Sequence, residues 1–222
     1  IIGEKTGLSD EEMNIAITAA WFHDAGFTVS SKEHEKESQT IAKEYLSSKD
    51  MDDEFIDRVL RCIHATRMPQ DPGEDLPAMV LCDADMSYLS EDFYMQRTAL
   101  LRDEWNHISE DKISKRTYWE MTVEMFWKHD YYTEYGKTVF TPGKEKNLDL
   151  ILEILAKMRK KSKEEIKKLK NENLKLSEKL KQEKDHNGKG RNRHKVFFSF
   201  SKRHDCTSGS IGVLEYWSIG VI

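Results

Sequence analysis

The chain has 222 residues, of which 38% are hydrophobic and 34% charged, with only 4 prolines. This length and composition suit one sizeable helix-rich domain with an appendage. No apolar run approaches the ~20 residues that span a bilayer, so these residues are not expected to cross a membrane. The three cysteines form no CxxC pair, which argues against a zinc ribbon and fits a reducing cytoplasm. We therefore expect a cytoplasmic protein.

The formal net charge of −5 hides an uneven distribution along the chain. Residues 1–156 carry 17 Lys and Arg against 32 Asp and Glu, a balance of −15, whereas residues 157–185 carry 12 against 6, a balance of +6. A strongly acidic front end is a poor electrostatic match for a nucleic-acid backbone. We expect no nucleic-acid partner.

Helical patterns follow one another through the first two thirds of the chain. Ser9 with Glu12 forms a capping-box sequence, and the helix it starts is expected to end near Gly26 in a left-handed turn. Similar periodicity predicts further helices. They are expected at about 31–46, 53–66, 76–89, 91–108 and 113–128. No alternating strand pattern is present, so the predicted fold class is all-α.

The texture of the sequence changes after Pro142-Gly143, which suggests domains at 1–142 and 143–186. A heptad pattern can be laid over 148–183, with Ile166 and Asn173 at position a and Leu169 and Leu176 at d. Asn at a favours a parallel two-stranded coil in one register, which predicts a possible homodimer. A single charged helix without a partner remains the alternative. Residues 187–222 show no period and are expected to be unstructured, or to be a frameshifted tail.

The pair His23-Asp24 ends a helix that is otherwise small and apolar. A buried imidazole and carboxylate need partners, because desolvation makes unpaired polar groups costly. Nitrogen and oxygen donors side by side are good ligands for a divalent metal ion. An isolated pair of this kind is more simply explained as a core histidine satisfied by its neighbour.

A second acidic cluster strengthens the metal interpretation. Asp83 and Asp85 lie inside an apolar helical stretch, and Asp85 is one turn from Leu81 and Leu89, on a face expected to be buried. A buried carboxylate is costly unless it is paired or bound to metal. We therefore predict a divalent-metal site formed by His23, Asp24 and Asp85.

The order of these motifs resembles the HD superfamily of metal-dependent phosphohydrolases, whose ligand pattern H…HD…D lies on an all-helical core. The resemblance covers about residues 5–140 and rests on His23-Asp24, on His34-Glu35-x-x-Ser38 and on Asp83-Ala84-Asp85. It implies that His23, Asp24 and Asp85 bind a metal ion, which Mn, Mg, Fe, Co, Ni or Zn would all suit. It also implies that His23 and Asp24 are catalytic.

Further residues have weaker support as site residues. The resemblance implies that His34 or His64 could hold a second metal ion or the phosphate. A solvated helix start explains His34 equally well, and a polar cap role explains His64 better. Arg67 suits bidentate contact with phosphate, or capping of a helix C-terminus. Asp83 and Glu35 are expected to contact the metal ligands and orient them without binding the ion themselves. His107 and His129 are interpreted as surface or structural residues.

The family's first metal histidine lies upstream of the HD pair, and no histidine precedes His23. We expect this chain to be an N-terminally truncated fragment. With a coiled coil after the core, it looks most like bacterial HD proteins that continue into a membrane-embedded effector region of cyclic-nucleotide phage defence. Membrane attachment is thus expected only in a longer parent protein.

The expected activity is hydrolysis of a nucleotide or another small phosphoester by metal-activated water. One alternative is a catalytically weak module that senses a nucleotide and relays the signal through the coiled coil to a C-terminal effector. A further alternative is an interaction scaffold in which the buried polar residues are merely satisfied.

Overall fold

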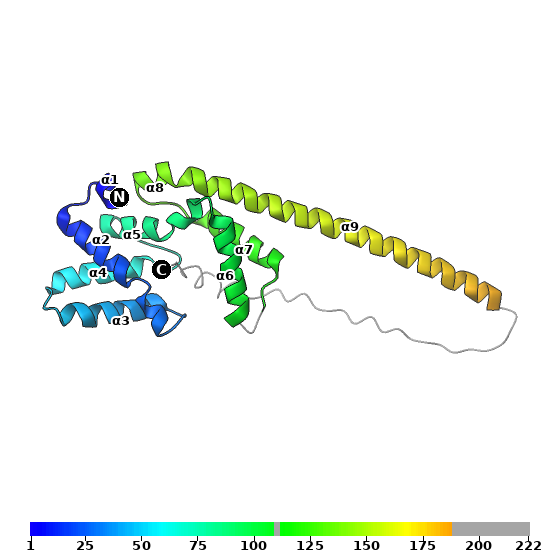
Figure 1. Ribbon diagram of the computed structural model, residues 1–222, viewed down its shortest axis with the longest axis horizontal. Coiled ribbons are helices and arrows are strands. Elements are labelled where there is room, and N and C mark those ends of the chain that lie inside the picture. Colours follow the sequence, from blue (N-terminus) through cyan, green and yellow to red (C-terminus); the bar gives the residue numbers. More distant parts are fainter. Residues whose placement is uncertain (109–111, 188–222) are drawn as a thin grey trace. The chain divides into compact units, whose positions relative to one another are not determined.

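The computed structural model describes residues 1–108 and 112–187, with side chains described for 1–107 and 112–179. Within these ranges all regular secondary structure is α-helix or 3-10 helix and no strand occurs (Figure 1), which confirms the all-α prediction. The tail expected to be unstructured lies outside the described residues, apart from Asn187. The helices are α1 Ile2–Thr6, α2 Asp10–Phe22, α3 His34–Ser47, α4 Asp53–Ala65, α5 Leu76–Asp85, α6 Tyr94–Ile108, α7 Lys115–Lys128, α8 Glu134–Val139 and α9 Thr141–Asn187, with 3-10 turns η1 Ala25–Thr28 and η2 Ser87–Ser90.

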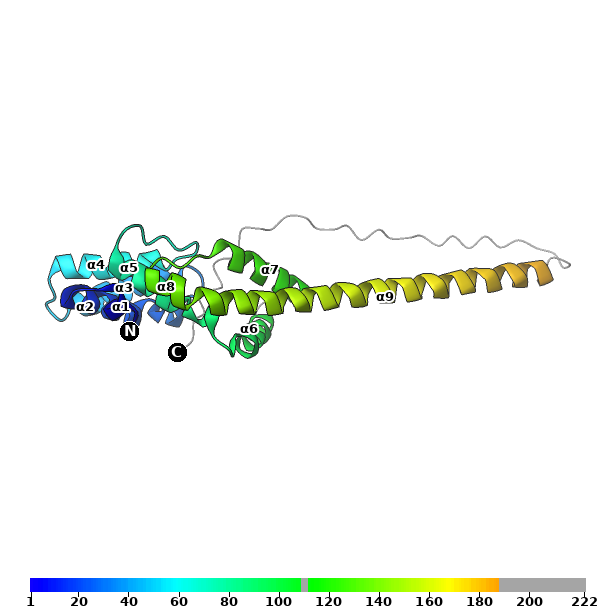
Figure 2. The same cartoon turned by 90° about the horizontal axis from the view of Figure 1, so that it is seen from above.

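The chain divides into two compact units, whose described parts are residues 1–152 and residues 153–187. Helices α1 to α8 and the first turns of α9 belong to the first unit. The rest of α9 forms the second (Figure 2). Helix α9 therefore continues across the domain boundary that was expected at 142/143.

Two helix starts follow the local sequence closely. Ser9 caps α2, and its hydroxyl accepts from the amide of Glu12 while the Glu12 carboxylate accepts from the amide of Ser9. Asp52 caps α4 by accepting from the amide of Phe55. Each cap satisfies a backbone N–H that has no partner within its helix. The capping box predicted at Ser9 is confirmed.

The predicted end of α2 is wrong in its detail. Helix α2 ends at Phe22 with His23 as its C-cap, and Gly26 lies in η1 rather than in a left-handed turn. Glycine is needed there for space, because a Cβ at Gly26 would overlap the carbonyl oxygen of His34. The glycine thus permits η1 to approach the first turn of α3.

Other boundaries differ by a few residues from those expected. Helix α3 begins at His34 because Glu33, just before it, adopts a left-handed conformation with φ 52°. Helix α5 ends at Asp85 and is followed by η2, so the helix expected to reach Leu89 is interrupted at Met86. The short helices α1 and α8 were not predicted, because five or six residues are too few for a clear hydrophobic period.

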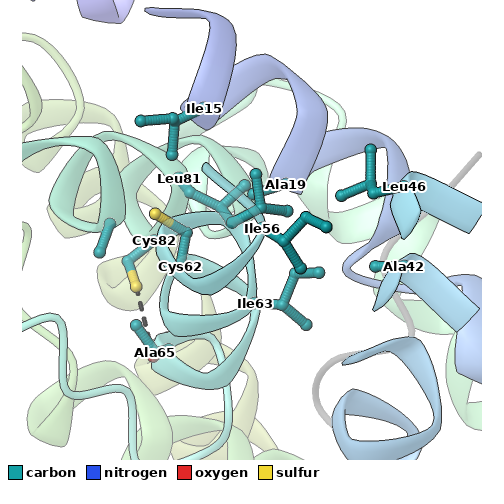
Figure 3. Close-up of a cluster of buried hydrophobic side chains, with 12 residues drawn as sticks. Ile15, Ala19, Ala42, Leu46, Ile56, Cys62, Ile63, Ala65, Leu81 and Cys82 are labelled. Atoms are coloured by element: carbon teal, nitrogen blue, oxygen red, sulfur yellow. Dashed lines mark hydrogen bonds between the residues drawn. The ribbon is translucent and has the colours of Figure 1, made fainter. Parts of the chain in front are cut away.

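Helices α2, α3, α4 and α5 share one hydrophobic core (Figure 3). Ile15 and Ala19 of α2 belong to the same core as Ile56 and Ile63 of α4, and α3 contributes the small side chain of Ala42 to it. Each fully buried large aliphatic side chain contributes about 1.5–3 kcal/mol. This core holds the C-terminal end of α2 and the C-terminal end of α5 in place, and these are the segments that carry His23 and Asp85.

Helices α6 and α7 pack through aromatic residues. The Tyr118 hydroxyl of α7 donates to the carbonyl of Thr98 on α6 (2.9 Å), and the Trp105 ring of α6 meets the Tyr118 ring edge-on. These side chains are buried, and buried aromatic pairs add about 0.5–1.5 kcal/mol beyond their area. The aromatic content of this segment therefore serves packing.

The first turns of α9 are anchored to the helical domain by a stripe of Lys144, Asn147 and Ile151, which are all buried. The Asn147 amide donates to the carbonyls of Leu89 (2.8 Å) and Glu91 (2.9 Å). The heptad expected over 148–183 places Leu152 at position a, yet Leu152 is exposed while its neighbour Ile151 is buried.

Farther along α9, the side chains of the expected seam are exposed. Ile166, Leu169 and Leu176 all have more than half of their surface accessible. No helix in the described part of the chain is both long enough and apolar enough to cross a membrane.

Candidate metal centre

The HD pair lies where α2 turns towards α3, and Ser38 of α3 braces this turn. The Ser38 hydroxyl donates to the carbonyl of His23 (2.6 Å) and accepts from the amide of Gly26 (2.8 Å). The bond from Gly26 is buried, the bond to His23 is partly buried, and Ser38 itself is fully buried. Two backbone groups freed by the end of α2 are thus satisfied by one side chain. The turn carrying His23 and Asp24 is thereby attached to α3.

The imidazole of His23 has one nitrogen committed to the backbone. Its Nδ1 lies 2.8 Å from the carbonyl oxygen of Ala20, and because a carbonyl only accepts, Nδ1 carries the proton of this bond. Nε2 then faces the carboxylates, 3.3 Å from Asp24 Oδ2 and 3.7 Å from Asp85 Oδ1. Histidines that bind metals are generally held in this way, with one nitrogen donating to the protein and the other directed at the ion.

His34 is the most deeply buried polar residue of the cluster, with 1% of its side chain exposed. Its ring stacks on Phe27, and its Nε2 lies 3.5 Å from Asp24 Oδ1 and 3.5 Å from Glu35 Oε1. Neither ring nitrogen, nor Asp24 Oδ1, has a hydrogen-bond partner among the described residues. Buried polar atoms without partners are rare in folded proteins, and a bound ion is one accepted explanation.

Burial and mutual attraction pull the ionisable groups of this cluster in opposite directions. Burial lowers the pKa of His23, but the carboxylates of Asp24 and Asp85 outweigh it and raise that pKa to about 11. Burial tends to raise the pKa of Asp24, yet His23 and His34 bring it below its usual value. For Asp85 burial prevails, and its pKa is raised. The cluster therefore favours a cation at Nε2 of His23, where a metal ion would compete with the proton.

The donor set fits a divalent ion in its chemistry. Imidazole nitrogens and carboxylate oxygens are the usual ligands of such ions, which bind them at about 2.0–2.2 Å. Donors around one ion at these lengths lie about 3–3.5 Å apart, close to the separations between His23, Asp24 and His34. No trio of His, Cys, Asp or Glu within the described residues has the geometry of a formed metal site. The fit thus rests on donor chemistry and on the unpartnered buried atoms.

One contributor was missed by the sequence analysis. Gln70, in the loop between α4 and α5, donates from Nε2 to Asp85 Oδ2 (2.8 Å). The backbone carbonyl of Gln70 accepts a hydrogen bond from the Tyr132 hydroxyl (2.7 Å). Gln70 follows Pro69 in a polar loop without periodicity, so the local sequence held no signal for this contact.

Asp83, expected to support the ligands, binds a different segment of the chain. Its carboxylate accepts from the amides of Tyr132 (2.7 Å) and Thr133 (2.9 Å) and from the Thr133 hydroxyl (2.6 Å). Burial raises the pKa of Asp83 against these three hydrogen bonds. Gly136 lies so close that a Cβ there would overlap Asp83 Oδ2. Asp83 therefore ties α5 to the segment that leads into α8.

The remaining predicted residues lie at the surface. His64 is exposed on α4, and Arg67 forms an ion pair with Glu33 (3.1 Å), with about half of each side chain accessible. In the described part of the chain, neither residue forms a hydrogen bond or ion pair with His23, Asp24 or Asp85. The structure thus brings together His23, Asp24, His34, Glu35 and Asp85, and leaves His64 and Arg67 outside this cluster.

Comparison with known proteins identifies no relative: no family model, no curated protein and no solved structure matches this chain.

Proposed function

We propose that this chain is a metal-dependent phosphohydrolase domain that acts on a nucleotide or another small phosphoester. The observation that carries the proposal is the meeting of His23, Asp24 and Asp85, with His23 Nε2 directed at both carboxylates. These residues come from the ends of two helices that are packed by a common core. The resemblance to the HD superfamily rests on these residues together with His34-Glu35-x-x-Ser38 and Asp83.

The cluster has a buried side and an accessible side. His34 and Asp85 have 1% and 4% of their side chains exposed, whereas His23 and Asp24 retain 19% and 14%. In the proposal, the buried pair supports the ion from within the protein. The accessible pair leaves room for water and for a substrate, as a catalytic metal site requires.

A bound divalent ion would supply Lewis acidity, lowering the pKa of a coordinated water and polarising the phosphoryl oxygen. His23 would donate its Nε2 lone pair, because the bond from Nδ1 to Ala20 holds the ring in the required tautomer. The Asp24 carboxylate, at the accessible side, would orient the attacking water by accepting a hydrogen bond from it. His34, beside Asp24, is the additional donor for the ion or the phosphate.

The test loads the chain with Mn²⁺ and measures bound metal together with hydrolysis of p-nitrophenyl phosphate, bis-p-nitrophenyl phosphate and nucleotides. Asp24→Asn and Asp85→Asn keep the side-chain shape while removing the charge. Asp92→Asn is the matched control, since Asp92 is exposed and pairs only with Lys146 at the surface. We expect both site variants to lose metal and turnover while the control retains both. Unchanged binding and turnover in the two site variants would overturn the proposal.

One observation favours a second candidate, a nucleotide-sensing module. Asp83, two residues before Asp85 on α5, binds the backbone of Tyr132 and Thr133, and this segment leads through α8 into α9. A change at the metal site would thereby reach the long helix. Binding of metal and nucleotide without product formation would favour this candidate over the hydrolase.

A further inference from the structure

The two oxygens of Asp85 have separate partners. Oδ1 faces His23 Nε2 at 3.7 Å, and Oδ2 accepts from Gln70 Nε2 at 2.8 Å. Asp85 is the last residue of α5, at the junction with the 3-10 turn η2, so regular α-helix supports it on one side alone. Its side chain therefore needs another support if Oδ1 is to stay directed at the site.

We propose that Gln70 is a positioning residue that orients the Asp85 carboxylate for the metal ion, an inference that rests on the proposed function. The amide of Gln70 donates to one oxygen and leaves the other for the ion. The chemistry of the pair sets the orientation of this amide, because the reversed amide would place its carbonyl oxygen against a carboxylate oxygen. Outer contacts of this kind hold the ligands of metal sites in their binding geometry.

Gln70 is itself held from the other side. The Tyr132 hydroxyl donates to the backbone carbonyl of Gln70 (2.7 Å), and the backbone amide of Tyr132 donates to Asp83 Oδ1 (2.7 Å). Because Asp83 and Asp85 lie on the same helix, the hydrogen bonds run from α5 through Tyr132 and Gln70 back to α5. This closed path ties the loop residue Gln70 to α5 through both its side chain and its backbone.

The path also explains an otherwise unfavourable choice of residue. Gln70 Oε1 is buried and has no hydrogen-bond partner among the described residues. If Gln70 had no role beyond the loop, its Oε1 would be a buried acceptor left unpaired without a compensating interaction. The donor on the same amide is the group that Asp85 requires, and a side chain without a hydrogen-bond donor could not supply it.

The experiment compares Gln70→Ala with Gln39→Ala. Gln39 is the matched control because its amide also donates to a single protein acceptor, the Leu60 carbonyl (2.8 Å), from a partly buried position between α3 and α4. Co²⁺ is titrated into each folded protein, and its visible absorption reports both the affinity and the ligand geometry. Thermal melts of the metal-free proteins measure stability separately.

We expect Gln70→Ala to weaken Co²⁺ binding by about 10–100-fold and to change the absorption spectrum, as loss of an outer contact does in metal sites. Gln39→Ala should lower only the melting temperature. Tyr132→Phe, which frees the Gln70 backbone, should weaken binding in the same direction by a smaller factor, and it decides the matter if Gln70→Ala does not fold. Co²⁺ affinity within twofold of the unsubstituted chain in the folded variants would overturn the inference alone. An unsubstituted chain that binds no Co²⁺ would overturn the proposed function and this inference together.

Discussion

Phe27 stacks on the buried imidazole of His34, with 3.7 Å between the ring centroids and 16° between the ring planes. The stacking covers a face of the imidazole and leaves its edge directed at Asp24 and Glu35. A ring packed in this way has little rotational freedom. The ring of His34 is therefore held in an orientation from which Nε2 could donate its lone pair to a metal ion.

From this arrangement we predict that His34→Gln weakens Mn²⁺ binding by at least about tenfold, the lower range for loss of a supporting contact in a metal site. The glutamine preserves much of the volume, so packing on Phe27 is largely kept. His107→Gln, an exposed histidine of α6, is the control. Isothermal titration measures the affinities, and equal values for the two variants would contradict a role for His34 at the ion.

Gly26→Ala should damage both the fold and the site. The added methyl group would overlap the His34 carbonyl, and overpacking of this kind costs about 1–3 kcal/mol or more. The turn carrying His23 and Asp24 must then move away from Ser38. The free energy of unfolding from urea denaturation should fall by that amount, and Mn²⁺ binding should weaken. Gly7→Asn is the control, because Gly7 has open space around it and asparagine adopts its left-handed conformation more readily than most residues. Similar losses in both variants would argue against the crowding at Gly26.

Because His129 is buried, we predict that the stability of the fold depends on pH. Burial, with the Lys144 ammonium nearby, lowers the pKa of His129 to about 3, and its ring nitrogens have no hydrogen-bond partners among the described residues. The unfolded chain binds this proton near pH 6.5 while the folded chain does not. Stability is therefore lost as the pH falls below about 6.5, by about 1.4 kcal/mol per pH unit from this group. Denaturation of the unsubstituted chain and of His129→Gln at pH 7 and pH 5 isolates the contribution. The stability lost between the two pH values should be smaller in the variant, and an equal loss would contradict the prediction.

Substitution of two leucines of α9 would test the predicted homodimer. Leu169 lies at heptad position d, and Leu174, at position b, is equally exposed in the single chain. If two copies pair along the seam, Leu169→Lys buries a charge in the interface, whereas Leu174→Lys faces solvent. We expect sedimentation equilibrium to show a dimer for the unsubstituted chain and for Leu174→Lys, and a monomer for Leu169→Lys. A monomeric unsubstituted chain would support the single charged helix instead.

The sequence was sufficient for the features that depend on near neighbours. The capping box at Ser9, the cap at Asp52 and the all-α class follow from groups three or four residues apart, where helical geometry allows only one arrangement. That His23, Asp24 and Asp85 lie close together was also expected from the sequence, because charges within apolar helical stretches require partners wherever those helices pack.

Only the tertiary structure decided which distant groups meet. The support of Asp85 by Gln70, the brace that Ser38 forms behind His23 and the diversion of Asp83 to Tyr132 and Thr133 join segments that no periodicity connects. The same holds for Gly26, whose small size serves the approach of α3 rather than a left-handed turn. Hydrogen bonds across a core depend on how whole helices are oriented and spaced. That orientation results from the summed packing of many side chains, and no short stretch of sequence encodes it.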